Sequence, residues 1–436
     1  MDAAAGLASG GRRTDMQDRP YRFRKISLDV AGESGKNHAA IGPGSPDPAR
    51  LAPSRRKILR MPTLLRAKRL STAIAGAIFM TFAHGGQFVV GQVGPMSGLE
   101  ASQGRAYAAG MQLLFDTVNK AGGANGNTFV LASRDDGGRP EDTVNVTRRL
   151  IAEERPLVLA GYFGNRNIAS LVDSGILEKE KIALVGYRAA DLRSSTPYLY
   201  SIRAGLHDEL GKITEHLATI GVTRLGLFYE DGPDAGGVVA ASDEAAAKAH
   251  VAIVAKASYP PGTARVGPAV ELLAKAAPQA IVMVSNGAPA AAFIEQYRAS
   301  GGSAQLFASS SAEIEQLSKR LGKEQMQGVA IAQVTPSPYR ISSRLAKELN
   351  DAVDRAGHPD ASVSFAMMEG FIAAKVIVEA VRRQNAKVSR EGMPAALDGI
   401  GNYDAGGYVV GFRHGMHVGS SFVELSIVSS AGRIRQ

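Results

Sequence analysis

FVVGQVGPMSG, residues 88–98, joins a short apolar segment to a loop of Gly, Pro and Ser. The apolar part predicts a β-strand, and the amphipathic stretch 103–119 after the loop predicts a helix. Glycines let the backbone approach a ligand closely, and Ser97 would offer a hydroxyl beside a helix N-terminus. This stretch therefore predicts the start of an α/β domain with a binding loop at one edge.

The same strand–helix pattern recurs along the chain in two series. The expected strands are 88–93, 128–134, 156–160 and 181–185, then 223–229, 251–257, 279–284 and 305–308. Apolar runs such as 157–160 and 280–284 are typical of parallel strands that are buried on both faces. We expect an α/β fold of two doubly wound parallel-sheet lobes joined by a hinge, with connections near 203–207 and 329–335. The helical stretches 342–355 and 364–383 should pack back on the first lobe.

The charge of the chain is concentrated at its N-terminal end. Residues 1–70 hold 15 Lys or Arg and 6 Asp or Glu, so the remaining 366 residues carry 35 of each sign. A nucleic-acid-binding face needs net or clustered positive charge on the folded part. The balanced charge of that part argues against nucleic acid as a partner.

The N-terminal segment also predicts export. Residues 1–60 are expected to be a disordered extension or to precede the true start at Met61. In 61–86, basic residues precede the apolar run 70–82 and a small-x-small site, which predicts a signal peptide cleaved near Gly85 or Gly86. A twin-arginine signal at 54–60 is the alternative. The chain has no Cys, so we expect a periplasmic protein that is not a lipoprotein.

The strand, loop and helix of 88–119, the glycine turn 122–126, a strand at 128–134 and the pair Asp135-Asp136 occur in a distinctive order. That order resembles the start of periplasmic solute-binding proteins of the leucine/isoleucine/valine type, and the resemblance covers about residues 88–436. It implies the type I periplasmic binding protein fold. It also implies a receptor that delivers a small solute to the inner-membrane permease of an ABC transporter. We expect this receptor to be a monomer. We place lobe 1 at 87–205 plus 335–400 and lobe 2 at 206–334 plus 401–436.

Ligands of open α/β sheets bind beyond the carboxyl ends of the strands. This rule selects loops that combine glycine or small polar residues with a following helix. The candidate ligand-binding residues are Ser97, Gln103, Gly164, Asn165, Gly186, Tyr187, Arg188, Asp234, Asn286 and Ser310. For single Ser, Asn or Asp residues, helix capping is the alternative interpretation.

The resemblance also indicates a change in ligand. In similar amino-acid binders, an acidic residue of the second lobe holds the ligand ammonium, and the corresponding place here falls near Ser310, which is uncharged. Arg188 would instead bind a carboxylate through two parallel hydrogen bonds, with Tyr187 stacking or donating its hydroxyl. We therefore expect a small polar or anionic solute rather than leucine, isoleucine or valine. The alternative is that Arg188 points to solvent or pairs with Asp191.

No motif in the sequence requires catalysis. His414 and His417 could bind a metal, but no nearby acid or thiol completes a set, so we expect a solvated turn. Phosphate-loop and dinucleotide glycine motifs are absent from the sequence. We therefore expect no enzyme activity, cofactor or metal. The alternatives are a periplasmic sensor for a signalling partner and a hydrolase acting in the cleft.

Overall fold

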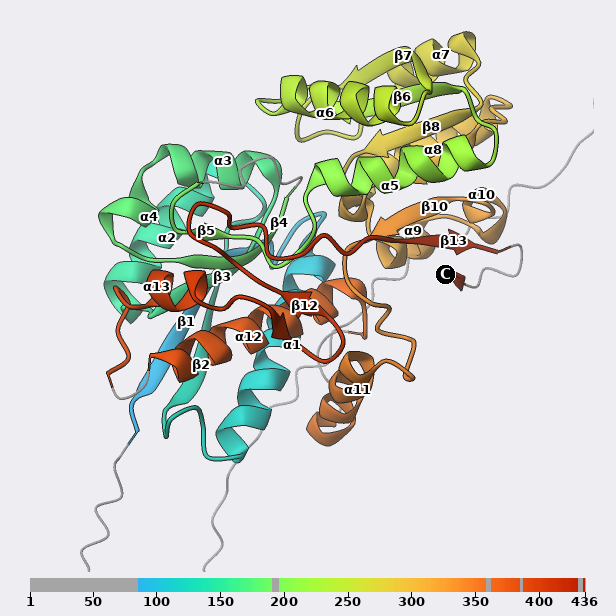
Figure 1. Cartoon of the computed structure of the whole chain (residues 1–436). Helices are drawn as coiled ribbons and strands as arrows, with labels where there is room; N and C mark the ends of the chain where they lie inside the picture. Colours follow the sequence, from blue (N-terminus) through green and yellow to red (C-terminus); the bar gives the residue numbers. More distant parts are fainter. Residues whose placement is uncertain (1–84, 190–195, 358–361, 385–386, 430–433, 436) are drawn as a thin grey trace, which may run out of the picture. The chain divides into compact units, whose positions relative to one another are not determined.

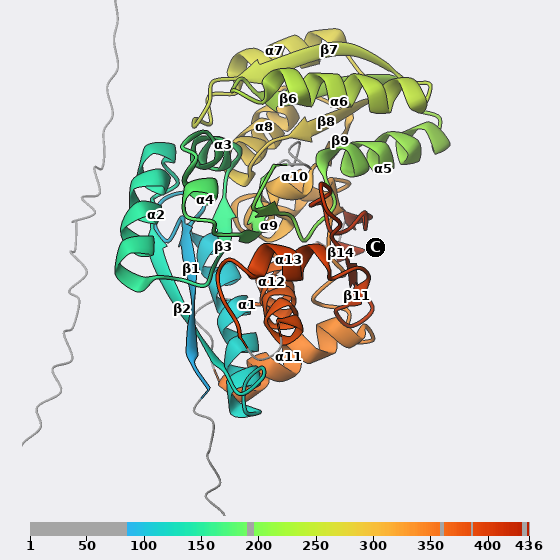
Figure 2. The same ribbon diagram turned by 60° about the vertical axis from the view of Figure 1, so that its left-hand side comes forward.

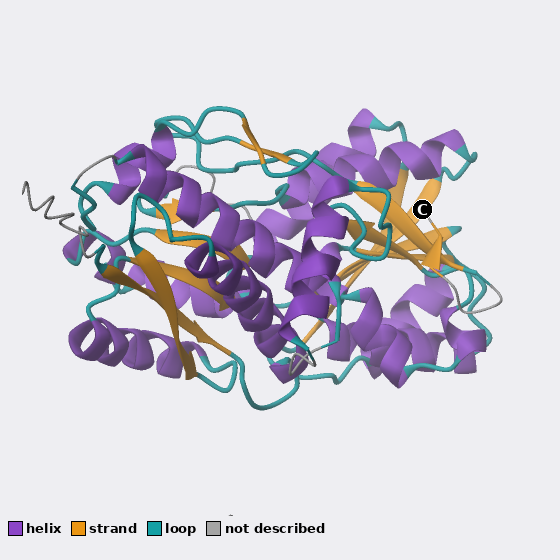
Figure 3. Cartoon of the chain, turned by 90° about the horizontal axis from the view of Figure 1, so that it is seen from below, coloured by secondary structure: helices purple, strands orange, loops and turns teal. Residues whose placement is uncertain are grey.

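The computed structural model describes residues 85–189, 196–357, 362–384, 387–429 and 434–435. The expected disordered extension and nearly all of the expected signal peptide lie outside these residues. Two β-sheets organise the described part, and each sheet lies between layers of helices (Figure 3). Within these ranges, no helix combines the length and the apolar character needed to cross a bilayer.

The first sheet has the strand order β2-β1-β3-β4-β5, and all of its strand pairs are parallel. Its strands are β1 (Gln87–Gly94), β2 (Thr128–Asp135), β3 (Val158–Phe163), β4 (Leu184–Arg188) and β5 (Leu199–Tyr200). Every residue of β3 and β4 is buried. The apolar composition of these strands follows from this position, because helices cover both faces of the sheet.

Helices pack on both faces of the first sheet (Figure 1). One face carries α2 (Pro140–Glu154), α3 (Asn165–Asp173) and α4 (Ile176–Lys179), and the other carries α1 (Ala101–Lys120), α11 (Arg344–Ala356), α12 (Phe365–Arg383) and α13 (Met393–Asp398). Figure 2 shows α11 beside α1 and α12. A Cβ atom at Gly110 would lie 2.0 Å from the Met367 carbonyl oxygen. The close packing of α1 on α12 therefore requires glycine there.

The second sheet has the order β14-β13-β10-β9-β8-β6-β7. Its strands are β6 (Arg224–Glu230), β7 (Ala252–Tyr259), β8 (Ala280–Val284), β9 (Gln305–Ala308), β10 (Ala330–Gln333), β13 (Glu424–Val428) and β14 (Ile434–Arg435). The strands β13 and β14 pair antiparallel, and the others pair parallel. The second sheet is therefore mixed, whereas we expected a purely parallel sheet.

The helices of the second lobe also cover both faces of its sheet. α5 (Leu206–Thr219) and α6 (Ala235–Lys248) enclose one apolar core, and α7 (Gly267–Ala276), α8 (Gly287–Ala299), α9 (Ile314–Arg320) and α10 (Lys323–Met326) enclose the other. A short 3₁₀ helix, η1 (Ser310–Ala312), follows β9. Both lobes thus have the expected doubly wound layout.

Three segments connect the two lobes: 201–205 before α5, 334–343 after β10, and 411–423 before β13. The third follows a small hairpin of β11 (Tyr403–Asp404) and β12 (Val409–Val410). The hydroxyl of Tyr408 lies 2.9 Å from both the Ile202 and the Val334 carbonyl oxygens, so it joins the first two connections. The backbone N–H of Ser201 donates to the His417 carbonyl at 2.8 Å, which ties the first connection to the third.

The predicted two-lobed α/β fold is confirmed, with differences in its connections. Residues 206–219 form α5, of which only the first two fall in an expected connection, and 330–333 form β10, where we expected a connection. The predicted lobe boundaries imply a third crossing at 400–401. The predicted boundaries assign 401–436 to lobe 2. β13 lies in the second sheet, whereas Tyr408 and Phe412 pack in the core of the first lobe. We therefore propose that the boundary falls within 411–423.

Candidate ligand-binding cleft

A small cavity of about 80 Å³, lined by polar and charged residues together with apolar surface, lies where the carboxyl ends of strands from both lobes meet. The first lobe contributes most of its lining, and the second contributes two polar residues. The lining residues are Pro95, Glu100, Gln103, Gly138, Phe163, Gly164, Asn167 and Arg188 from the first lobe and Asn286 and Ser311 from the second. The position agrees with the rule that selected these loops from the sequence.

Arg188 is the central cation of this cavity. It ends β4, and its side chain is only 4% exposed. Its Nη1 donates to Gln103 Oε1 at 2.5 Å, and its Nε lies 3.2 Å from Glu369 Oε1. The carboxylate of Glu313, from the second lobe, lies 3.6 Å from Nη1. The guanidinium carbon also lies 6.0 Å from the centre of the Phe163 ring. Arg188 is therefore held on several sides.

The alternative interpretation in which Arg188 points to solvent is wrong. Asp191, the other partner considered for it, lies outside the described residues. The guanidinium is buried because β4 continues through residue 188, so that Arg188 occupies a strand position beside α1 and α12 instead of an exposed loop.

A second buried cation, Arg203, lies behind the cavity in the first connection. Its Nη2 donates to Glu209 Oε1 at 3.0 Å and also to the Ser310 hydroxyl. Its Nη1 lies 3.5 Å from Glu369 Oε2, so the Glu369 carboxylate bridges both arginines. Glu209 also accepts hydrogen bonds from the backbone N–H and the hydroxyl of Ser310, at 2.7 and 2.9 Å. We call these residues, together with Arg188 and Glu313, the inter-lobe ion network.

Carboxyl groups outnumber guanidinium groups around the cavity. Glu100, Glu209, Glu313 and Glu369 face Arg188 and Arg203. Burial raises the pKa of Glu313 to about 8, with nearby carboxylates adding to the rise and Arg188 opposing it. Burial also raises the pKa of Glu100. The surroundings therefore favour a cationic group or a proton, in addition to the anion site offered by Arg188.

Gln103 connects the two lobes across the cavity. Its Nε2 donates to Glu100 Oε2 at 2.5 Å and to Gln316 Oε1, in the second lobe, at 2.9 Å. Its Oε1 accepts the hydrogen bond from Arg188. The Gln316 amide in turn donates to the Leu99 carbonyl at 2.9 Å. One side chain thus orients the central cation, a carboxyl group and a residue of the opposite lobe.

The structure brings some of the ten predicted residues together and not others. Gln103, Gly164, Arg188 and Asn286 line the cavity. Ser310 lies beside it in the inter-lobe ion network, and its carbonyl oxygen is 3.4 Å from Arg188 Nη2. The remaining five do not line it: Ser97, Asn165, Gly186, Tyr187 and Asp234.

Two of these five lie within a strand that ends later than predicted. β4 runs to residue 188 instead of 185, so Gly186 and Tyr187 are strand residues. The Tyr187 side chain is buried in the core formed with α3 and α4, away from the cavity lining. A Cβ atom at Gly186 would lie 2.4 Å from the Tyr107 hydroxyl, so glycine is needed there for packing.

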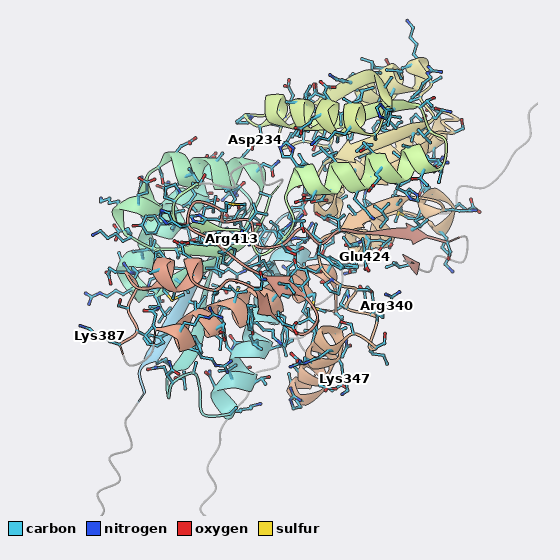
Figure 4. The ribbon with its side chains drawn as sticks, in the orientation of Figure 1. Asp234, Arg340, Lys347, Lys387, Arg413 and Glu424 are labelled. Carbon is cyan, nitrogen blue, oxygen red and sulfur yellow. The ribbon has the colours of Figure 1, made fainter. Side chains whose placement is uncertain are left out.

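The other three lie on loops or helix starts. Ser97 is exposed, and its backbone N–H donates to Asp135 Oδ1 at 3.2 Å. Asn165 is the first residue of α3. Asp234 directly precedes α6, where Figure 4 labels it. None of the three lines the cavity, and within the described part of the chain no side-chain capping hydrogen bond forms at the start of α3 or α6.

Several residues of the site were not predicted. Glu100, Phe163 and Asn167 line the cavity, and Asn167 donates to the Thr143 hydroxyl at 2.7 Å. The acids of the inter-lobe ion network come from segments far apart in the sequence. One signal was available. Glu369 is the only acid within 365–378, where Lys375 is the only other charged residue, and charged residues are almost never fully buried unless paired.

The two histidines considered as metal ligands behave differently from each other. His414 is fully exposed, in agreement with a solvated turn, whereas the His417 side chain is only 8% exposed. The His417 ring stacks on Tyr200 with 4.2 Å between ring centres, and its Nε2 lies 3.5 Å from Asp398 Oδ1. In the described ranges, no group of three or more His, Asp or Glu residues could hold a metal ion.

Two α/β lobes, three connections and a polar cavity at the facing strand ends define a two-lobed solute-binding protein. The chain belongs to the Periplasmic binding protein family, whose family model matches residues 87–426. Members of this family are periplasmic or extracytoplasmic receptors for small molecules and serve ABC transporters.

Known proteins support this assignment. A substrate-binding periplasmic protein from Ralstonia solanacearum is 37% identical, with a TM-score of 0.76 over 80% of this chain and 99% of that one. An amino acid binding protein from Pseudomonas aeruginosa is 30% identical over 100 residues, which are 23% of this chain and 27% of that relative. A branched-chain amino acid ABC transporter protein from Thermus thermophilus, with bound valine, is 16% identical with a TM-score of 0.70 over 80% and 94% of the two chains. At that identity the similarity shows the fold alone.

Proposed function

We propose that this protein is the non-enzymatic receptor of an ABC importer that binds a small amino-acid-like solute in the cleft cavity and delivers it to the inner-membrane permease. The observation that carries the proposal is the buried Arg188 at the junction of both lobes, with Gln103 and Glu313 beside it. A guanidinium in this position can bind a carboxylate through two parallel hydrogen bonds. The amino acid binding protein of Pseudomonas aeruginosa makes the same class of solute a reasonable first choice.

The excess of acids refines the expected ligand. A purely anionic solute would add negative charge to surroundings in which the Glu313 pKa is already raised. A zwitterion places its carboxylate on Arg188 and its ammonium near Glu100 or Glu313, so both charges are compensated. We therefore favour a zwitterionic solute over the carboxylate without an ammonium group that the uncharged Ser310 suggested.

Entry of the solute requires the lobes to separate. The cavity of about 80 Å³ is smaller than the 300–1,000 Å³ that is typical of small-molecule sites. The connections 201–205, 334–343 and 411–423 provide the hinge. Opening would break the contacts of Arg188 with Glu313 and of Gln103 with Gln316, and a bound solute would stabilise the closed form by its own contacts to both lobes.

A thermal-shift screen of the purified protein, followed by titration calorimetry, tests the proposal. We expect a zwitterionic amino acid or a related solute to raise the melting temperature, because a ligand at 100 times its Kd adds about 2.7 kcal/mol. Arg188→Ala should weaken that solute by about 2–5 kcal/mol. Arg265→Ala, an exposed arginine outside the cavity lining, is the control and should bind as the wild type does. A preference for dicarboxylates over zwitterions would contradict the refined ligand class.

Export by an N-terminal signal is the second part of the proposal. The family assignment places the protein outside the cytoplasm, and the apolar run 70–82 after basic residues provides a route. N-terminal sequencing of the exported protein should give a start near Gly85 or Gly86. An exported protein that retains 70–82 would contradict cleavage there.

A further inference from the structure

A second cavity, of about 610 Å³, lies on the first lobe and shares no residue with the cleft cavity. It is formed by the end of α2, by α4 with the turn before it, and by Arg390, which precedes α13. Figure 4 labels Lys387, which marks this last segment. The volume lies within the range of sites that hold small molecules. We call it the basic cavity, because four cations and one acid line it: Arg148, Arg155, Lys179, Arg390 and Glu180.

Most of these cations have no carboxylate partner in the part of the chain that the structure describes. Among the described residues, none brings a carboxylate oxygen within 4.0 Å of Arg148, Arg155 or Lys179. Arg390 is 3.9 Å from Glu180, and its Nε donates to the Pro156 carbonyl at 3.0 Å. The lining thus carries a net charge of about +3 in one concave surface. The 366 residues after residue 70 balance to zero, so this local excess is not a reflection of the bulk composition.

The helix dipole explains only part of this arrangement. Arg155 follows α2 directly, and a cation interacts favourably with the carbonyl groups at a helix C-terminus. Its φ is 46°, a left-handed backbone that usually selects glycine or asparagine at this position. Lys179 and Arg390 come from separate segments and converge on the same cavity. The buried side chains of Ile151 and Ile176 give the cavity an apolar floor.

We propose that the basic cavity binds a ligand that carries phosphate groups with a total charge of −2 or more negative. Guanidinium groups bind phosphate oxygens in pairs, and an ammonium adds a compact point charge. A single carboxylate would leave two of the cations uncompensated. The apolar floor would contact a non-polar part of the same molecule. A soluble phosphate ester and the headgroup of an anionic phospholipid share this chemistry, and either source satisfies the site.

Titration calorimetry with inorganic pyrophosphate at low ionic strength tests the site directly. We expect one binding event per chain, weakened at least about tenfold in the double variant R148E/K179E, since both side chains are exposed and unpaired. The matched control R265E/K323E makes the same change in net charge at exposed residues outside the cavity and should bind as the wild type does. Circular dichroism checks that both variants are folded.

Co-sedimentation with vesicles of one part phosphatidylglycerol to three parts phosphatidylcholine separates the two sources. Vesicle binding that R148E/K179E loses and R265E/K323E keeps would support the site and assign it to a lipid headgroup. Pyrophosphate binding without vesicle binding would support it and assign it to a soluble phosphate ester. Absence of binding to both probes, or equal loss in both double variants, would overturn the proposal. Affinity for the cleft solute should be unchanged in both variants.

Discussion

The two lobes are built from the same strand–helix units, but they contribute different chemistry to the cleft cavity. The first lobe supplies charged and large groups, among them Arg188, Glu100 and Phe163. The second lobe supplies only Asn286 and Ser311 to the lining. Its acids Glu313 and Glu209 do not line the cavity but form ion pairs with Arg188 and Arg203, respectively. We therefore propose that the first lobe holds the solute and that the second closes over it.

The largest expected effect concerns the ion network that both lobes share. Arg203→Ala removes a cation that is 1% exposed and leaves Glu209 and Glu369 without it. Breaking a buried ion pair by removing one partner costs about 3–5 kcal/mol, so the free energy of unfolding in urea should fall by that amount. Arg265→Ala is the exposed control. A loss below about 0.5 kcal/mol would show that the network does not stabilise the fold.

The second prediction tests the asymmetry between the lobes directly. Asn286→Ala, on the second lobe, should weaken solute binding by only about 1 kcal/mol, the usual value of one neutral hydrogen bond. Arg188→Ala should cost two to five times as much, about 2–5 kcal/mol. Titration calorimetry with a solute found by screening measures both. Equal losses would contradict the division of roles.

The third prediction concerns pH. Because burial raises the pKa of Glu313 from 4.5 to about 8, the folded protein keeps this proton over a range where the unfolded chain has lost it. The contribution of this proton to the free energy of unfolding is fully present below about pH 4.5, and it is lost as the pH rises through about 8. Glu313→Gln removes this dependence, so its unfolding free energy should increase relative to the wild type between pH 5 and 8. Urea melts measure this difference. If the unfolding free energies of the wild type and Glu313→Gln change in parallel with pH, the raised pKa of Glu313 is contradicted.

The smallest effect is expected at the connections. Tyr408→Phe removes the hydroxyl that contacts the Ile202 and Val334 carbonyls and should lower the unfolding free energy by about 1 kcal/mol. Because both carbonyls belong to the connections, small-angle scattering should also show a more open average form without solute. If neither the scattering profile nor the unfolding free energy changes, the Tyr408 hydroxyl does not hold the connections together.

Local sequence patterns were sufficient for most of the fold. The apolar runs of β3, β8 and β9 and the amphipathic α1 have periods that need no tertiary information. The pattern of α5 was also present, since Leu206, Leu210, Ile213 and Leu217 recur at helical spacing. No helix was predicted there, and the expected connection near 203–207 covers only the first two residues of α5. The antiparallel pairing of β13 with β10, which lies about 90 residues earlier, is a long-range contact that no local pattern reports.

The site was less predictable than the fold. The strand-end rule selected Arg188 and Asn286, but the three-residue error at the end of β4 assigned Tyr187 to a ligand-binding loop instead of the strand. Glu313 and Glu369 reach Arg188 only after α9 and α12 pack against opposite sides of the cleft. The balance of charge around the cavity, on which the expected ligand depends, is therefore a property of the packed structure and not of any one segment.

A crystal structure of the protein with a solute found by screening would show directly whether Arg188 binds it. We expect the solute between the lobes, with a carboxylate oxygen about 3 Å from the Arg188 guanidinium and a further contact to Asn286 or Ser311. We also expect an ammonium group near Glu100 or Glu313. A solute bound outside the cleft, or within it with Arg188 still paired only to Glu313 and Glu369, would contradict the proposed role of Arg188.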